Sequence, residues 1–231
     1  MKTLTVIQHT SADYLGLMED HFEGRRIRFT YNRPFTERSV VPKFKQIADG
    51  LVLLGGGPWG SAGPRNVPSL VEEVELCHAC HEAGLPIIGI GLGAQILSLA
   101  TGGSTEAAPL RFSTGYARRV DDDALNGYLP ESYPLVQYLR DRAVPPADAR
   151  ILSVDEDEQA ALFQVGELAF GFSAHPGIKL AMAEDLIMEF EEIPDDTATA
   201  LNQLRTLKTE IEDALVPIMT GLIQLTELMR D

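Results

Sequence analysis

Two short segments place residues capable of chemistry directly after apolar runs. The first reads Gly-Ile-Gly-Leu-Gly-Ala-Gln over residues 89–95, and the second reads Gly-Phe-Ser-Ala-His-Pro-Gly over residues 171–177. Imidazole exchanges a proton near neutral pH, so His175 is a candidate general base. Each segment follows a predicted strand, which places both at the edge of a sheet where ligand sites form in α/β proteins.

A second group of potential ligands reads Cys-His-Ala-Cys-His from Cys77 to His81. Cys-x-x-Cys-His is the spacing of covalent haem attachment, and Cys77 and His81 share one helix face, where they could supply two of the four ligands of a structural zinc. The alternative is an ordinary helix with Cys77 packed inward and its histidines in water. Neither Cys77 nor Cys80 follows a strand, so a role as nucleophile beside His175 is disfavoured. We expect no metal and no cofactor.

The elements that must position these segments alternate between apolar runs and helical patterns, which predicts an α/β fold. A helix is expected over 68–82, another from about residue 94 to Gly102, and a third over 178–191. The stretch 106–149 is loop-rich and yields no clear element. Strands are expected over residues 4–7, 26–31, 50–54, 86–90, 150–154, 159–165 and 168–173.

The end of the chain carries an amphipathic pattern. Apolar residues recur at spacings of three and four from Leu201 to Met229, which predicts helix. Pro217 lies inside this run and is expected to break or kink it, giving a helical pair. Two interpretations remain open for the apolar stripe: it packs on the sheet of its own chain, or it forms a surface for a second subunit. We expect residues 1–194 to form the main domain and residues 195–231 a helical extension.

The two strand-end segments resemble motifs of one enzyme family. Residues 89–95 are similar to the Gly-x-Cys-x-Gly-x-Gln nucleophile elbow of class I (triad) glutamine amidotransferases. Residues 171–177 are similar to that family's Gln-Phe-His-Pro-Glu segment, and Gly55-Gly56-Gly57-Pro58 is similar to its oxyanion loop. Weaker matches at residues 113–116, 140–146 and 159–166 fit the stand-alone members related to GMP synthase.

The resemblance implies a fold and a chemistry. The fold is a doubly wound mixed sheet between two helical layers, a flavodoxin-like arrangement, with the site at the carboxyl ends of the strands. In the family, a cysteine at the elbow attacks the amide of glutamine, a histidine takes its proton, and a glutamate orients the histidine. Backbone N–H groups hold the oxyanion, and the ammonia released goes to a synthetase partner.

This sequence departs from the family at two of the three catalytic positions. The match places Gly91 where the cysteine belongs, His175 at the histidine and Gly177 at the glutamate. Glycine carries no nucleophile, and it adopts the strained elbow conformation without steric penalty. We therefore expect an amidotransferase-like protein without glutaminase activity, which acts by binding a ligand or as a partner subunit. The alternative is an enzyme that uses the same pocket with a different nucleophile or base.

The resemblance also implies ligand-binding residues and partners. Gly56, Gly57 and Leu92 correspond to positions whose N–H groups hold the oxyanion, and Gln95 corresponds to a residue lining the glutamine site. The expected partners are glutamine or a related small molecule, and a synthetase subunit or a second copy of the chain contacted through the C-terminal helices.

Composition excludes other classes of function. Lys and Arg number 19 and Asp and Glu number 34, so the formal net charge is −15. Such an acidic surface repels phosphate backbones and anionic lipid, so we expect neither nucleic acid nor membrane as a partner. The first nine residues show no signal-peptide pattern, which favours a cytoplasmic location.

Overall fold

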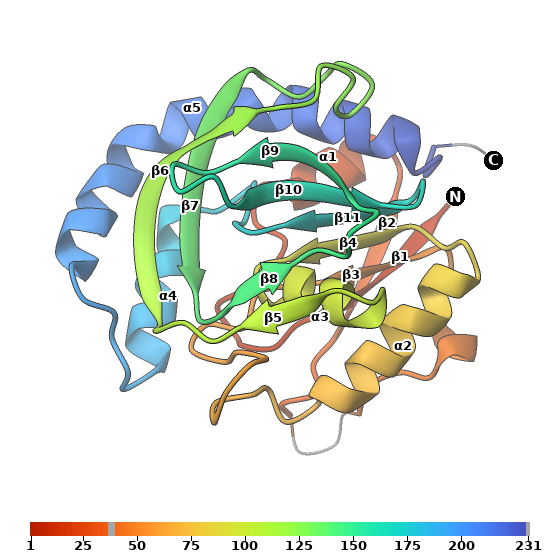
Figure 1. The fold of residues 1–231 in the computed structure, drawn as a ribbon, viewed down its shortest axis with the longest axis horizontal. Helices are drawn as coiled ribbons and strands as arrows, with labels where there is room; N and C mark the ends of the chain where they lie inside the picture. The colour runs from red at the N-terminus through yellow and green to blue at the C-terminus, as the bar shows by residue number, and fades with distance from the viewer. Residues whose placement is uncertain (37–39, 230–231) are drawn as a thin grey trace.

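A nine-stranded mixed sheet forms the centre of the molecule in the computed structural model, which describes residues 1–36 and 40–229 (Figure 1). The strand order is β2-β1-β3-β4-β11-β10-β9-β6-β7. The pairs from β2 to β11 are parallel, and those from β11 to β7 are antiparallel. The strands are β1 Thr3–Ile7, β2 Arg28–Asn32, β3 Gly50–Leu53, β4 Ile87–Ile90, β6 Arg111–Arg119, β7 Ser132–Leu139, β9 Arg150–Val154, β10 Ala160–Val165 and β11 Ala169–Phe172.

Helices cover both faces of the sheet. On one face, α2 (Leu70–Glu82) and α3 (Leu92–Ala100) pack against β3 and β4. On the other face lie α1 (Met18–Gly24) and the C-terminal half of α5 (Thr197–Leu225), as Figure 1 shows. α4 (Leu180–Glu189) packs between β7 and the first half of α5. This arrangement confirms the predicted doubly wound mixed sheet with flanking helices.

The stretch 106–149, for which no clear element was predicted, forms the far antiparallel edge of the sheet. β6 and β7 form a long hairpin within residues 106–149, and β5 (Ser104–Glu106) and β8 (Arg142–Val144) form a separate two-stranded sheet. β7 contains Pro134, which cannot donate a ladder hydrogen bond. A proline is tolerated there because β7 is the edge strand.

Of the break or kink expected at Pro217, the break does not occur, and the C-terminal run does not form a helical pair. α5 is a single helix from Thr197 to Leu225 with Pro217 inside it. A proline within a helix costs about 3 kcal/mol or more. Close to Pro217, however, Leu215, Ile218 and Met219 are buried against the sheet, and burying each such side chain stabilises by roughly 1.5–3 kcal/mol. Packing therefore outweighs the local cost.

The apolar stripe of α5 is covered within the chain. Its first half contributes Leu204, Leu207 and Ile211 to a core cluster shared with α4, and its second half joins the core beneath α1. Gly221 allows this close packing: a Cβ atom built there would lie 2.3 Å from the carbonyl oxygen of Leu125.

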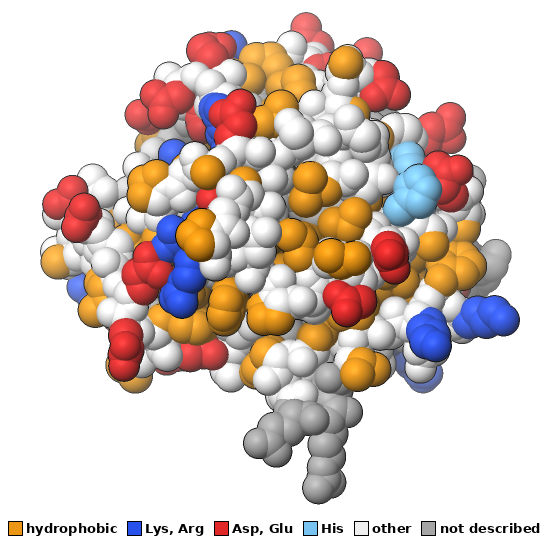
Figure 2. Space-filling view, turned by 60° about the horizontal axis from the view of Figure 1, so that its bottom comes forward, with side chains coloured by type: hydrophobic (Ala, Val, Ile, Leu, Met, Phe, Trp, Pro, Cys, Tyr) orange, Lys and Arg blue, Asp and Glu red, His pale blue; other side chains and the backbone are white. Residues whose placement is uncertain are grey.

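The surface is acidic, as the composition requires. Figure 2 shows acidic side chains spread over one face of the molecule, with hydrophobic ones between them. No helix in the part of the chain that the structure describes is both long enough and apolar enough to cross a membrane.

Candidate functional site

Gly91 forms the turn between β4 and α3, where the resemblance places the catalytic cysteine. Its φ of 56° and ψ of −111° are a conformation that glycine adopts far more readily than other residues. Its N–H donates to the carbonyl oxygen of Phe172 at 2.8 Å, which ties the turn to the end of β11. Among the described residues, a Cβ atom at Gly91 would meet only the Cα atom of Gly55, at 3.5 Å. The backbone thus favours glycine although there is space for a side chain.

The glycine-rich loop after β3 lies against this turn. A Cβ atom at Gly56 would lie 2.5 Å from Cδ2 of Leu92, so only glycine permits this approach. Gly57 has a φ of 55°, which also favours glycine. The structure therefore brings Gly56 beside Leu92, two of the positions predicted to supply N–H donors.

His175 lies at the end of β11 beside Gly91, but both of its ring nitrogens are engaged by the backbone. Nε2–H donates to the carbonyl oxygen of Tyr14 at 2.7 Å, and the Gly177 N–H donates to Nδ1 at 3.1 Å. Burial lowers the pKa of His175 to about 4, against the effect of the Tyr14 hydrogen bond. The ring is therefore neutral at pH 7, and its lone pair already accepts a hydrogen bond. It is poorly placed to act as a general base.

Gly177, at the glutamate position, is covered by the loop that precedes α1. The Leu17 N–H donates to the Gly177 carbonyl oxygen at 2.8 Å. A Cβ atom at Gly177 would lie 3.1 Å from Cγ and from the backbone nitrogen of Met18. A carboxylate side chain cannot enter this space unless residues 16–18 move.

Gln95, predicted to line a glutamine site, is fully buried and committed to internal hydrogen bonds. Its Oε1 accepts from Ser61 Oγ at 2.5 Å, and its Nε2 donates to the carbonyl oxygen of Arg140 at 2.7 Å. The neighbouring Asp141 carboxylate accepts from the N–H groups of Ser61 and Ala62 at 2.8 Å each. Gln95 therefore holds the loop after the glycine-rich segment, and both its amide oxygen and its amide nitrogen make hydrogen bonds within the chain.

Little space remains around Gly91. One cavity of about 20 Å³ lies between Gly91, His175 and Asp13. Another of about 10 Å³ lies between Gly91, Gln137 and Ser173. Small-molecule sites usually measure about 300–1,000 Å³, so neither cavity can take glutamine in this conformation.

A buried ion pair beneath the glycine-rich loop was not found by sequence reasoning. His9, in the loop after β1, donates from Nε2 to Glu73 of α2 at 2.7 Å and from Nδ1 to the carbonyl oxygen of Gly55 at 3.0 Å. Ser69 donates to the other carboxylate oxygen of Glu73 at 2.6 Å. Burial alone would lower the pKa of His9, but the charge of Glu73 and these hydrogen bonds outweigh it, so the pKa lies above 6.5. The pair fixes Gly55 between β1 and α2.

Glu73→Gln is expected to lower the free energy of unfolding by about 3 kcal/mol at pH 6, because it leaves a buried cation without its partner. A raised folded-state pKa means that the pair's contribution is complete below pH 6.5 and is lost as pH rises through that pKa. The difference from the unmodified protein should therefore narrow at alkaline pH in denaturant titrations. Glu72→Gln, on the exposed face of the same helix, is the control. If Glu73→Gln lowered the free energy of unfolding by the same amount at pH 6 and at alkaline pH, the result would contradict the ion pair.

The Cys77–His81 segment lies on α2 with both cysteines in the core. Burial raises the pKa of Cys77 strongly and that of Cys80 to about 11, so neither is a thiolate at neutral pH. His78 is bonded through Nδ1 to the carbonyl oxygen of Ala100 at 2.9 Å. Within residues 1–36 and 40–229, no three potential metal ligands lie together.

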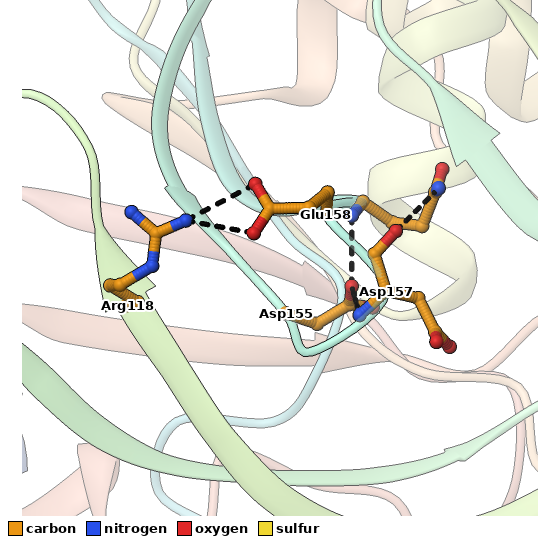
Figure 3. A network of polar contacts seen from close by, with 5 residues as sticks. Arg118, Asp155, Asp157 and Glu158 are labelled. Atoms are coloured by element: carbon orange, nitrogen blue, oxygen red, sulfur yellow. Dashed lines mark hydrogen bonds and ion pairs between the residues drawn. The ribbon is translucent and has the colours of Figure 1, made fainter.

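The acidic run before β10 forms a tight turn, shown in Figure 3. The Asp155 carboxylate accepts from the N–H groups of Asp157 and Gln159 at 3.0 and 2.8 Å. Arg118 of β6 donates to both carboxylate oxygens of Glu158, at 2.9 and 3.1 Å. These contacts fasten the β9–β10 turn to the neighbouring strand.

The fold and the strand-end motifs agree with the family comparison. The profile described as glutamine amidotransferase class-I matches residues 26–190, which is 165 of the 231 residues. The chain therefore belongs to the class-I glutamine amidotransferase family, as the motifs indicated.

Individual relatives are similar to this chain at modest identity. A GMP synthase (glutamine-hydrolysing) from Gloeothece citriformis is 26% identical over 160 residues, which cover 67% of this chain and 28% of the relative. A carbamoyl phosphate synthase small chain from Neisseria meningitidis serogroup A is 30% identical over 140 residues, which cover 60% of this chain and 37% of the relative. The chain thus spans well under half the length of these two relatives.

Solved structures share the whole fold. A glutamine amidotransferase from Thermotoga maritima superposes with a TM-score of 0.80 at 22% identity, covering 98% of each chain. A glutamine amidotransferase from Methylobacillus flagellatus gives 0.82 at 18% identity, covering 97% of this chain and 95% of that one.

Proposed function

We propose that this protein is an amidotransferase-fold subunit that does not hydrolyse glutamine and acts through contacts with a partner. The observation that carries the proposal is Gly91: the turn that would hold the nucleophile has no side chain, and the cavity beside it measures about 20 Å³. His175, Gly177 and Gln95 support the same conclusion, because each is engaged or covered by its own chain.

The expected partner is a synthetase. Relatives of this chain carry the names GMP synthase and carbamoyl phosphate synthase small chain. Affinity purification of the tagged full chain from its native cells should recover a synthetase in stoichiometric amount. Recovery of the chain alone, at a mass that corresponds to a monomer, would count against a subunit role.

A second possibility is hydrolysis in the same pocket by a different residue. The buried carboxyl group of Asp13 favours it, since this group lies in the cavity beside Gly91 and His175. The size of the cavity disfavours it, because no substrate larger than a few atoms can reach that carboxyl group.

Titration calorimetry tests whether glutamine binds. Millimolar glutamine added to the protein should give only the heat of dilution, because the two cavities described beside Gly91, of about 20 and 10 Å³, are too small to accept it. Saturable heat that disappears in Gln95→Ala would overturn the proposal. Gln203→Ala, an exposed glutamine of α5, is the matched control.

A further inference from the structure

The cavity beside Gly91 contains two buried polar groups without partners. Oδ1 of Asp13 and the hydroxyl of Tyr138 make no hydrogen bond with any described residue. Asp13 is 6% exposed and Tyr138 is 7% exposed, and both line the same cavity of about 20 Å³. Buried polar groups are normally paired, because an unpaired one loses its hydration without compensation.

A third polar group faces the same space. Ser173, at the end of β11, also lines the cavity. Its Oγ accepts a hydrogen bond from Gln137 Nε2 at 3.1 Å, so its own proton is available to a second acceptor. Three hydrogen-bonding side chains from three different segments thus surround the space beside the Gly91 turn.

The volume fits one small molecule. A water molecule requires roughly 10–15 Å³ by the same measure and needs two to four polar partners. The cavity supplies about 20 Å³ and three partners. Gly91 lines this space, and a Cβ atom built there would have only the Cα atom of Gly55 nearby among the described residues, at 3.5 Å.

We propose that Asp13, Tyr138 and Ser173 form a binding site for a single water-sized hydrogen-bonding molecule, either water or ammonium. The occupant takes the space into which a side chain at position 91 would project, and it links the loop before α1 to β7 and β11. This site goes beyond the proposed function, since it depends on these three groups and not on whether glutamine is hydrolysed.

The charges nearby allow both occupants. Burial raises the pKa of Asp13 to about 7, with His9 lowering it and Glu189 of α4 raising it. A protonated Asp13 donates to water, and an ionised one accepts from water or from ammonium. His175, also in the cavity wall, is neutral because burial lowers its pKa to about 4. Ammonium has the size of water but only donates, and all three side-chain oxygens can accept.

A double-mutant cycle tests the bridge. Asp13→Val and Tyr138→Phe each remove one partner, and a shared occupant makes their effects couple by roughly tenfold in the unfolding equilibrium constant. Asp13→Asn keeps hydrogen-bonding capacity and should remain close to the unmodified protein, which provides a folded variant if Asp13→Val is unstable. Tyr133→Phe is the control, since buried Tyr133 bonds Ser153 and should be additive with Asp13→Val.

A crystal structure tests whether the site is occupied, and melting temperatures in different salts identify the occupant. A high-resolution crystal structure should show one isolated density peak within hydrogen-bonding distance of Asp13, Tyr138 and Ser173. A melting temperature that rises with ammonium chloride at pH 8, but not with sodium or methylammonium chloride, identifies ammonium; no such difference identifies water. A cavity without density, a direct Asp13–Tyr138 hydrogen bond, or additive Asp13→Val and Tyr138→Phe effects would overturn the site.

Discussion

Glutamine incubated with the purified protein is expected to yield no ammonia above the buffer background. Loss of the nucleophile in a catalytic triad costs on the order of 10⁶ in turnover, and here Gly91 offers none. His175 adds no base, because its lone pair accepts from the Gly177 N–H. The measurement is a coupled ammonia assay with an active family member as positive control. Steady turnover that is lost in His175→Ala would contradict the expectation.

Gly91→Cys extends the same test. The variant should fold with about 1–3 kcal/mol less stability, because a side chain enters a conformation that disfavours it. The new thiol is not expected to restore turnover, since the space for an orienting carboxylate at Gly177 is filled by Leu17 and Met18. Adding Gly177→Glu is expected to displace that loop and lower stability further. Ammonia release by the double variant would show that residues 16–18 yield more easily than their packing indicates.

Removal of α5 is expected to prevent folding. A chain ending at Pro194 loses many buried apolar side chains, each stabilising by roughly 1.5–3 kcal/mol, and domains have only about 5–15 kcal/mol in total. The lost residues include Leu204, Leu207, Ile211, Leu215, Ile218, Met219, Leu222 and Ile223. The truncated protein should aggregate or lack a cooperative melting transition in circular dichroism.

The matched control for that deletion is a chain ending at Leu228. Leu228 is 3% exposed, while Met229 is 61% exposed, so removing residues 229–231 should leave the melting temperature within a few degrees. A soluble chain ending at Pro194, with a melting temperature like that of the full protein, would mean that the covered stripe contributes little.

The central parallel strands were predictable because they are apolar on both faces. β3 and β4 read as unbroken hydrophobic runs followed by glycine, which is typical of buried parallel strands. β6 was not predictable in the same way. Its residues are mostly half-buried or exposed, so hydrophobic alternation is weak, and β7 carries a proline that argues against a strand.

The site shows a similar division. Gly91, His175 and Gly177 were identified because a motif fixes their spacing along the chain. Asp13 and the His9–Glu73 ion pair were not identified from the sequence. His9 and Glu73 are 64 residues apart, so their contact leaves no pattern in any short stretch of the sequence. The hydrogen bonds of Gln95 also could not be predicted. They join it to Ser61 and to the carbonyl oxygen of Arg140, which are distant along the chain and come together only in the folded protein.

The packing of α5 on α1 has a consequence for biosynthesis. Arg25, just after α1, donates to Thr220 of α5 at 3.3 Å across 195 residues of sequence, and Met18 and Phe22 share a core cluster with Leu215 and Leu222. While the ribosome is still making the central strands, this face of α1 has no cover. The nascent chain therefore exposes an apolar surface until synthesis has passed α5. Contacts between residues so far apart in the sequence slow folding. The period before α5 has been synthesised is therefore the stage at which a chaperone would bind.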